Sequence, residues 1–395
     1  MKRKYIKGVP VLLALMIISS NSALAEDAPV EVSAHQTSVP QARSDEDWGK
    51  LKDNVVEWSE IEALVHEFNP TVSDLWVTFN QDDKAGKYTT NYESVVSMID
   101  DNYESSVNSA ATEVLEALTE LQYATSYEET SLDRQAQSTD RAAALLSIGK
   151  TEKSVTETIR QSIISMYKAE LQQQIDQLTA VYDESLYNSA LTKLGAGIMT
   201  ETDVLSAKET MEKARLTLTQ DEDNALKSKQ LLNINLGYER NSDVMYPEVP
   251  MVSEEMFMAI NPDQDAETAI ENNYAIKINH RKLEVSSAES SKSSLNATIE
   301  SEQENVRADI TGRYNTLKQA KNSYEQAVLS ESNTLNEQAK VQRNYVAGNA
   351  SLRELEKADY QAQTARLYTQ IAQYKYASSY YDYTAAVAGL ASADQ

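Results

Sequence analysis

Two helical runs of this chain are separated by one short segment, Leu194-Gly195-Ala196-Gly197-Ile198-Met199-Thr200-Glu201-Thr202-Asp203-Val204. Its two glycines end a helical run, and glycine suits the left-handed residue that closes a helix. Thr200 or Thr202 then supplies a hydroxyl that can cap the first turn of a second helix. The sequence therefore predicts a tight turn between two antiparallel helices.

The helix before this turn has a one-sided apolar pattern. Between 152 and 194 the apolar positions recur mainly every three or four residues, as in a coiled-coil seam. These positions are Val155, Ile159, Ile163, Met166, Leu171, Ile175, Leu178, Tyr182 and Leu186. The pattern continues after the turn from Val204 to about Asn235. Residues 152–235 are therefore predicted to form one long helical hairpin.

A second turn of the same kind surrounds Gly348. When Gly348 is aligned with Gly197, Glu354 falls on Asp203 and Ala358 falls on Ala207. Two short amphipathic helices, ending near Asn69-Pro70 and Asn273-Tyr274, precede the two hairpins. This self-similarity indicates an internal duplication.

The N-terminus is predicted to be a signal peptide over residues 1–25. It combines a basic start, an apolar core from Val9 to Ile18, and the small-residue cleavage site Ala23-Leu24-Ala25. The protein is therefore expected to be exported. The polar residues 26–57 are expected to form a loose segment, and Ser59 is expected to cap the first helix.

Two helical repeats are expected to follow. The first covers 58–237 with its tip near 195–203, and the second covers 263–390 with its tip near 348–354. Residues 238–262 hold three prolines and mixed polarity, and are predicted to link the repeats.

Composition excludes several classes of protein. Ten glycines and seven prolines are too few for the turns of most β architectures. The chain has no cysteine and three widely spaced histidines, so disulfides, thiol chemistry and histidine-based metal or triad sites are not expected. A formal charge of −25 argues against nucleic acid as a partner. No enzyme and no cofactor are predicted.

The combined pattern resembles the TolC-like outer membrane efflux protein family. The resemblance covers nearly all of 59–388 and rests on a duplicated unit: an Asn-Pro-like helix start, a long helix, a tip and a returning helix. Gly197 to Val204 matches the family's tip motif, and Gly348 to Leu355 matches it more loosely. The segment 231–237 resembles the end of the family's returning helix.

The composition and the helical spacing predict an all-α chain, and the resemblance implies that three copies form a tapering helical tunnel. Its tips would meet a periplasmic adaptor protein and, through it, an inner-membrane pump, in the outer membrane or periplasm of the cell envelope. The residues expected at the adaptor-docking tips are Gly195, Gly197, Thr202, Asp203, Val204, Tyr345, Gly348, Ser351 and Leu352.

The resemblance also suggests roles at the entrance. Asp203 and Tyr345 match residues that join neighbouring hairpins and keep the entrance closed, and Glu354 matches a carboxylate that constricts the pore. Lys357 and Ala350 depart from the family, which has a second carboxylate and a basic residue at these positions. An alternative is that Asp203 and Glu354 are ordinary carboxylates favoured by helix dipoles.

A further departure concerns the two barrel strands that interrupt each half in the family. Only Tyr88-Thr89-Thr90-Asn91-Tyr92 has strand-like composition here, so the barrel is expected to be absent. This leaves an alternative function, a non-transporting structural or adhesive coiled-coil protein of the envelope. The duplicated tip favours the conduit, because a docking partner needs a fixed geometry. Seven tyrosines from Tyr360 to Tyr383 are expected to pack between helices.

Overall fold

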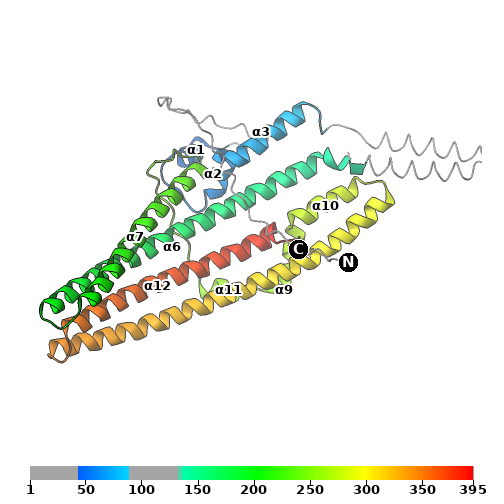
Figure 1. Ribbon diagram of the computed structural model, residues 1–395. Coiled ribbons are helices and arrows are strands. Elements are labelled where there is room, and N and C mark those ends of the chain that lie inside the picture. The colour runs from blue at the N-terminus through cyan, green and yellow to red at the C-terminus, as the bar shows by residue number, and fades with distance from the viewer. Residues whose placement is uncertain (1–42, 89–132, 135, 395) are drawn as a thin grey trace, which may run out of the picture. The chain divides into compact units, whose positions relative to one another are not determined.

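The computed structural model describes residues 43–88, 133–134 and 136–394 (Figure 1). The predicted signal peptide and most of the strand-like stretch at 88–92 lie outside these residues. Within the described ranges the regular elements are helices, beside one isolated bridge between Val55 and Met245. The predicted all-α fold is confirmed. Among these helices none is long and apolar enough to cross a membrane.

Four long helices form the two predicted hairpins. Helices α6 (Arg141–Gly195) and α7 (Glu201–Asn235) make the first, and α11 (Glu289–Val346) and α12 (Leu352–Ala385) make the second. Helix α6 begins before the expected residue 152, because the Asp140 side chain accepts a hydrogen bond from the Ala143 N–H and caps it.

A pair of short helices precedes each hairpin. Helices α2 (Ile61–Phe68) and α3 (Pro70–Lys84) precede the first, and α9 (Pro262–Asn272) and α10 (Tyr274–Glu284) precede the second. The short helix α8 (Glu254–Met258) lies in the segment between the repeats.

One buried asparagine joins the helices of each pair. The Asn69 side chain accepts hydrogen bonds from two N–H groups of α3, and its amide donates to the Asn235 carbonyl at the end of α7, 2.8 Å away. Asn273 does the same for α10, and its amide donates to the Ala391 carbonyl at 2.9 Å. We call these two arrangements the base joints. Each ties the start of a repeat to its end.

A glycine in the left-handed region completes each base joint. Gly237 has φ +83° and Gly389, within the π-helical turn η2 (Ala386–Leu390), has φ +114°. A Cβ on Gly237 would lie 2.3 Å from the Phe68 Cβ, and one on Gly389 would lie 2.5 Å from the Asn272 carbonyl oxygen. Only glycine allows the chain to pass so close at these points.

The expectation of a loose segment up to residue 57 is wrong for residues 43–57. Helix α1 (Asp45–Leu51) starts with a capping box at Ser44, and Leu51 and Val56 are buried against the first repeat. Arg43 forms an ion pair with the buried Glu67 at 3.0 Å. A few well-spaced apolar side chains anchor this otherwise polar segment.

The predicted Ser59 cap is also wrong. The N-cap of α2 is Glu60, whose side chain makes no capping bond to the helix. Instead, the Glu60 carboxylate accepts a hydrogen bond from the Glu57 N–H at 3.2 Å, in the turn before α2.

The long helices pack in the order α7, α6, α12, α11 (Figure 1). The two repeats therefore meet where α6 runs antiparallel to α12, and α7 and α11 form the two edges. One apolar cluster surrounds α2 and the first half of α6, and a second lies among α9, α11 and α12. Both cores lie toward the base joints, which leaves the tips outside them.

Candidate functional site: the paired hairpin tips

The first tip is a helix end closed by glycine. Gly197 has φ +74°, and its N–H donates to the Leu194 carbonyl at 2.9 Å. The Ile198 N–H donates to the Lys193 carbonyl at 2.8 Å. This pair of bonds is the Schellman arrangement, which satisfies carbonyls that α6 would otherwise leave free. Gly195 is the last residue of α6 and has no positive φ.

The second tip repeats this geometry. Gly348 also has φ +74°, and its N–H donates to the Tyr345 carbonyl at 3.0 Å. The Asn349 N–H donates to the Asn344 carbonyl at 2.8 Å. A Cβ added at Gly197 or Gly348 would meet no atom of the described residues within 4 Å, so within this part of the chain the tips are constrained by backbone conformation and not by packing.

A capping box starts the returning helix at each tip. The Thr200 hydroxyl donates to the Asp203 carboxylate at 2.8 Å, and the Ser351 hydroxyl donates to Glu354 at 2.8 Å. The backbone N–H of each cap residue donates to the same carboxylate. Of the two threonines considered, Thr200 is the cap, and Thr202 is an exposed residue of the first turn.

These capping bonds explain the electrostatics of both carboxylates. Hydrogen bonds from the Thr200 backbone and hydroxyl lower the pKa of Asp203, and those from Ser351 lower the pKa of Glu354. Within one chain, both carboxylates therefore serve their own hairpin. Bridging by Asp203 and constriction by Glu354 both require neighbouring chains and stay predictions.

Apolar side chains are exposed at both tips. Ile198 is 72% exposed, Val346 is 78% exposed and Leu352 is 56% exposed. Tyr345 is 38% exposed, whereas Val204 is buried. Lys357 is exposed, and Ala350 is half-buried. Exposed apolar residues beside rigid turns provide a surface that a protein partner can cover.

The two hairpins are fastened to each other near the tips by Arg353, a contact that the sequence did not indicate. The Arg353 guanidinium donates to the Ser185 hydroxyl at 3.1 Å and to the Ser185 carbonyl at 2.9 Å. It also pairs with Glu356 at 3.0 Å, within α12. The resemblance places a locking basic residue at Ala350, and Arg353 supplies a basic link from α12 to α6.

An aromatic seam continues between α6 and α12 toward the base. Tyr182 stacks on Tyr360 with ring centroids 4.5 Å apart, and Tyr167 stacks on Tyr374 at 5.7 Å. The Thr179 and Tyr360 hydroxyls are hydrogen bonded at 3.0 Å. The expectation that tyrosines of the last helix pack between helices is confirmed for these residues, whereas Tyr368 is 52% exposed.

No protein-family model matches the sequence, and no curated protein matches it. Solved structures do match. A membrane protein from Pseudomonas aeruginosa is 10% identical, with a TM-score of 0.56 over 94% of this chain and 97% of that one. The outer-membrane channel OprN is 10% identical, with a TM-score of 0.56 over 93% and 99%.

The open state of the Neisseria gonorrhoeae outer membrane channel MtrE is also similar. It is 12% identical, with a TM-score of 0.52 over 86% of this chain and 90% of that one. At such identities the likeness concerns the fold. This chain shares the fold of TolC-like outer membrane channels.

Proposed function

We propose that this chain is the conduit of an efflux or secretion system in the cell envelope. In this proposal three copies form a helical tunnel, and their tips dock a periplasmic adaptor protein that connects to an inner-membrane pump. The observation that carries the proposal is the duplicated hairpin with two geometrically equal tips, in a fold shared with outer membrane channels.

The edge helices support assembly with further copies. Helix α7 leaves Leu205, Leu216 and Leu226 more than half exposed, at intervals of about three turns that follow one side of the helix. Helix α11 leaves Leu329 65% exposed at the other edge. Edge helices with exposed leucines gain apolar burial when α7 of one copy meets α11 of the next.

The tips support a docking role. Ile198 directly follows the left-handed Gly197, and Leu352 starts α12 four residues after the left-handed Gly348; both are exposed. A trimer would present each of them three times in a fixed geometry. In the same trimer, Asp203 and Tyr345 would join neighbouring hairpins, and Glu354 would narrow the entrance.

We also infer that the chain is not an enzyme. The similar solved structures are named as channels or a membrane protein. In the described part of the chain no three histidine or acidic side chains are grouped so as to hold a metal ion. The proposal therefore assigns no reaction to the tips.

The first test is the absolute mass of the purified chain by light scattering, with and without detergent. We expect a trimer that Leu216→Asp dissociates, because a charge at the α7 edge would be buried in the assembly. Thr217→Asp, on the neighbouring exposed position, should leave the trimer intact. A monomer at every concentration would contradict the conduit and favour the structural envelope protein.

Docking is tested separately with cysteines introduced at Ile198 or Leu352. The chain has no cysteine of its own, so each label is unique. We expect cross-links from both positions to a purified periplasmic adaptor protein, and none from a cysteine at the exposed Glu170 on the shaft of α6. Equal cross-linking from all three positions would refute tip docking.

A further inference from the structure

A buried carboxyl group lies where the two repeats meet, far from the tips. The Glu157 side chain on α6 is 13% exposed. Its Oε1 accepts a hydrogen bond from the Gln161 amide at 2.7 Å. The nearest cation to Oε2 is the Arg160 guanidinium at 4.0 Å, which is too far for a hydrogen bond. The carboxyl group is therefore largely removed from water, and no cation of the described residues lies within hydrogen-bonding distance of it.

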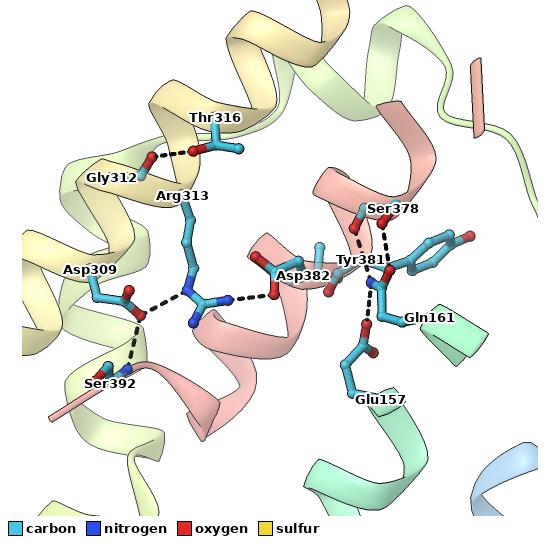
Figure 2. Close-up of polar contacts among 11 residues, drawn as sticks. Glu157, Gln161, Asp309, Gly312, Arg313, Thr316, Ser378, Tyr381, Asp382 and Ser392 are labelled. Atoms are coloured by element: carbon cyan, nitrogen blue, oxygen red, sulfur yellow. Dashed lines mark hydrogen bonds and ion pairs between the residues drawn. The ribbon is translucent and has the colours of Figure 1, made fainter. Parts of the chain in front are cut away.

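Gln161 carries the connection from this carboxyl group to the other repeat (Figure 2). Its amide nitrogen donates to the Ser378 carbonyl at 3.0 Å, and its oxygen accepts from the Ser378 hydroxyl at 2.5 Å. The same amide nitrogen also donates to Glu157. The charge of Glu157 thus acts on the group that joins α6 to α12.

The positively charged side chain on the other repeat, Arg313, is already paired with two carboxylates. Arg313 on α11 donates to Asp382 on α12 at 2.5 Å and to Asp309 on α11 at 2.8 Å (Figure 2). Asp309 also accepts from the Ser392 N–H at 2.9 Å. The charged groups around Glu157 are therefore Arg160 on its own helix, Asp382 on α12, and the Arg313–Asp309 pair on α11.

We propose that Glu157, Gln161 and Ser378 form a pH-dependent latch, which holds α6 against α12 while Glu157 is neutral and loosens when Glu157 is ionised. A neutral Glu157 carboxyl group still accepts the hydrogen bond from Gln161, and it adds no charge to the largely buried contact between α6 and α12. An ionised Glu157 carboxylate must be compensated by Arg160 or by water, and it repels the Asp382 carboxylate. Both the compensation and the repulsion compete with the hydrogen bonds between Gln161 and Ser378.

The surroundings of Glu157 place its ionisation near neutral pH. Burial raises the pKa of Glu157 to about 7, despite the opposing effects of Gln161 and Arg160, and Asp382 adds to the rise. Because α6 belongs to the first repeat and α12 to the second, the latch controls how firmly the two halves of one chain pack. This inference does not depend on the conduit proposal.

The test is hydrogen exchange of the full chain at pH 5.5 and pH 8.5, with rates corrected for intrinsic chemistry. When a local opening exposes Glu157, its pKa returns toward 4.5. We expect amides at 157–165 and 374–382 to open roughly thirty-fold more often at pH 8.5 than at pH 5.5. Glu157→Gln should lose this ratio and stay protected at both pH values.

Two comparisons make the result specific. Glu170→Gln, at an exposed position on the same helix, should retain the wild-type ratio. His66 also bonds to α6, and its hydrogen bond with Glu152 raises its pKa, so the latch is measured by the difference between wild type and Glu157→Gln. If that variant does not fold, the neutral Glu157→Met takes its place. An unchanged ratio in the neutral variant would overturn the proposal.

Discussion

Removing the buried asparagine of a base joint should destabilise the protein by an amount that depends on which repeat is changed. Asn273 and Asn69 are 1% and 2% exposed, and each accepts two backbone N–H groups and donates to one carbonyl. Asn261 is a useful control. It caps a helix as both of them do and precedes a proline as Asn69 does, but it is exposed.

The magnitudes follow from what each alanine leaves unpaired. Losing an N-cap costs about 1 kcal/mol. Asn273→Ala also strands the carbonyl of the buried Ala391, which adds about 1–3 kcal/mol. The total is about 2–4 kcal/mol. Asn69→Ala should cost less, because Asn235 is exposed and water can replace the lost donor. Asn261→Ala should cost about 1 kcal/mol or less.

The assay is urea unfolding followed by far-ultraviolet circular dichroism, with hydrogen exchange to locate the loss. We expect the order Asn273→Ala, then Asn69→Ala, then Asn261→Ala. Protection should fall first in α10 and η2 for the Asn273 variant. Equal losses for all three variants would refute the reasoning, because the cost would then come from helix capping alone.

Three more outcomes are expected. Gly197→Val should destabilise the first tip by about 1–2 kcal/mol, because valine disfavours the φ of +74° that Gly197 adopts. Gly195→Ala, in the last turn of α6, should be neutral or stabilising. Equal melting temperatures for the two variants would contradict the left-handed cap. The hydrogen bond with Glu152 on α6 raises the pKa of His66. The stabilisation from this bond is therefore complete below about pH 6.5 and is lost as the pH rises through the raised pKa. A plot of the free energy of unfolding against pH should be flatter over this range for His66→Gln than for the wild type. A double-mutant cycle on Tyr182 and Tyr360 should give a coupling of about 0.5–1.5 kcal/mol, and zero coupling would show that their stacking adds nothing.

The hairpins and their tips were predictable because their signals are local. A glycine at the end of an apolar-periodic run and a hydroxyl residue three positions before a carboxylate are read within a few residues. Both tips use these signals in the same way. The choice of Thr200 over Thr202 as the cap follows from Asp203 standing three residues later, which completes a capping box.

The contacts between the repeats were not predictable from such patterns. Arg353 reaches Ser185, 168 positions away in the sequence, and Gln161 reaches Ser378, 217 positions away. Nothing near Glu157 in the sequence indicates that its side chain is buried, because the burial comes from packing against α12, which is distant in sequence. The anchoring of residues 43–57 likewise depends on apolar surfaces that belong to the first repeat.

The base joints have a mechanical consequence for the tips. The first joint holds the Asn235 carbonyl at the end of α7, and the second holds the Ala391 carbonyl just beyond η2. At the opposite end of each hairpin, a Cβ added to the tip glycine would contact no described atom. Helix α7 has 35 residues, so it is a lever arm of about 50 Å. A tilt of about 6° at the pinned end would carry the tip about 5 Å, close to the rise of one helical turn. A small change of angle at a base joint is thus amplified into a displacement of the tip that is many times larger than the movement at the joint itself.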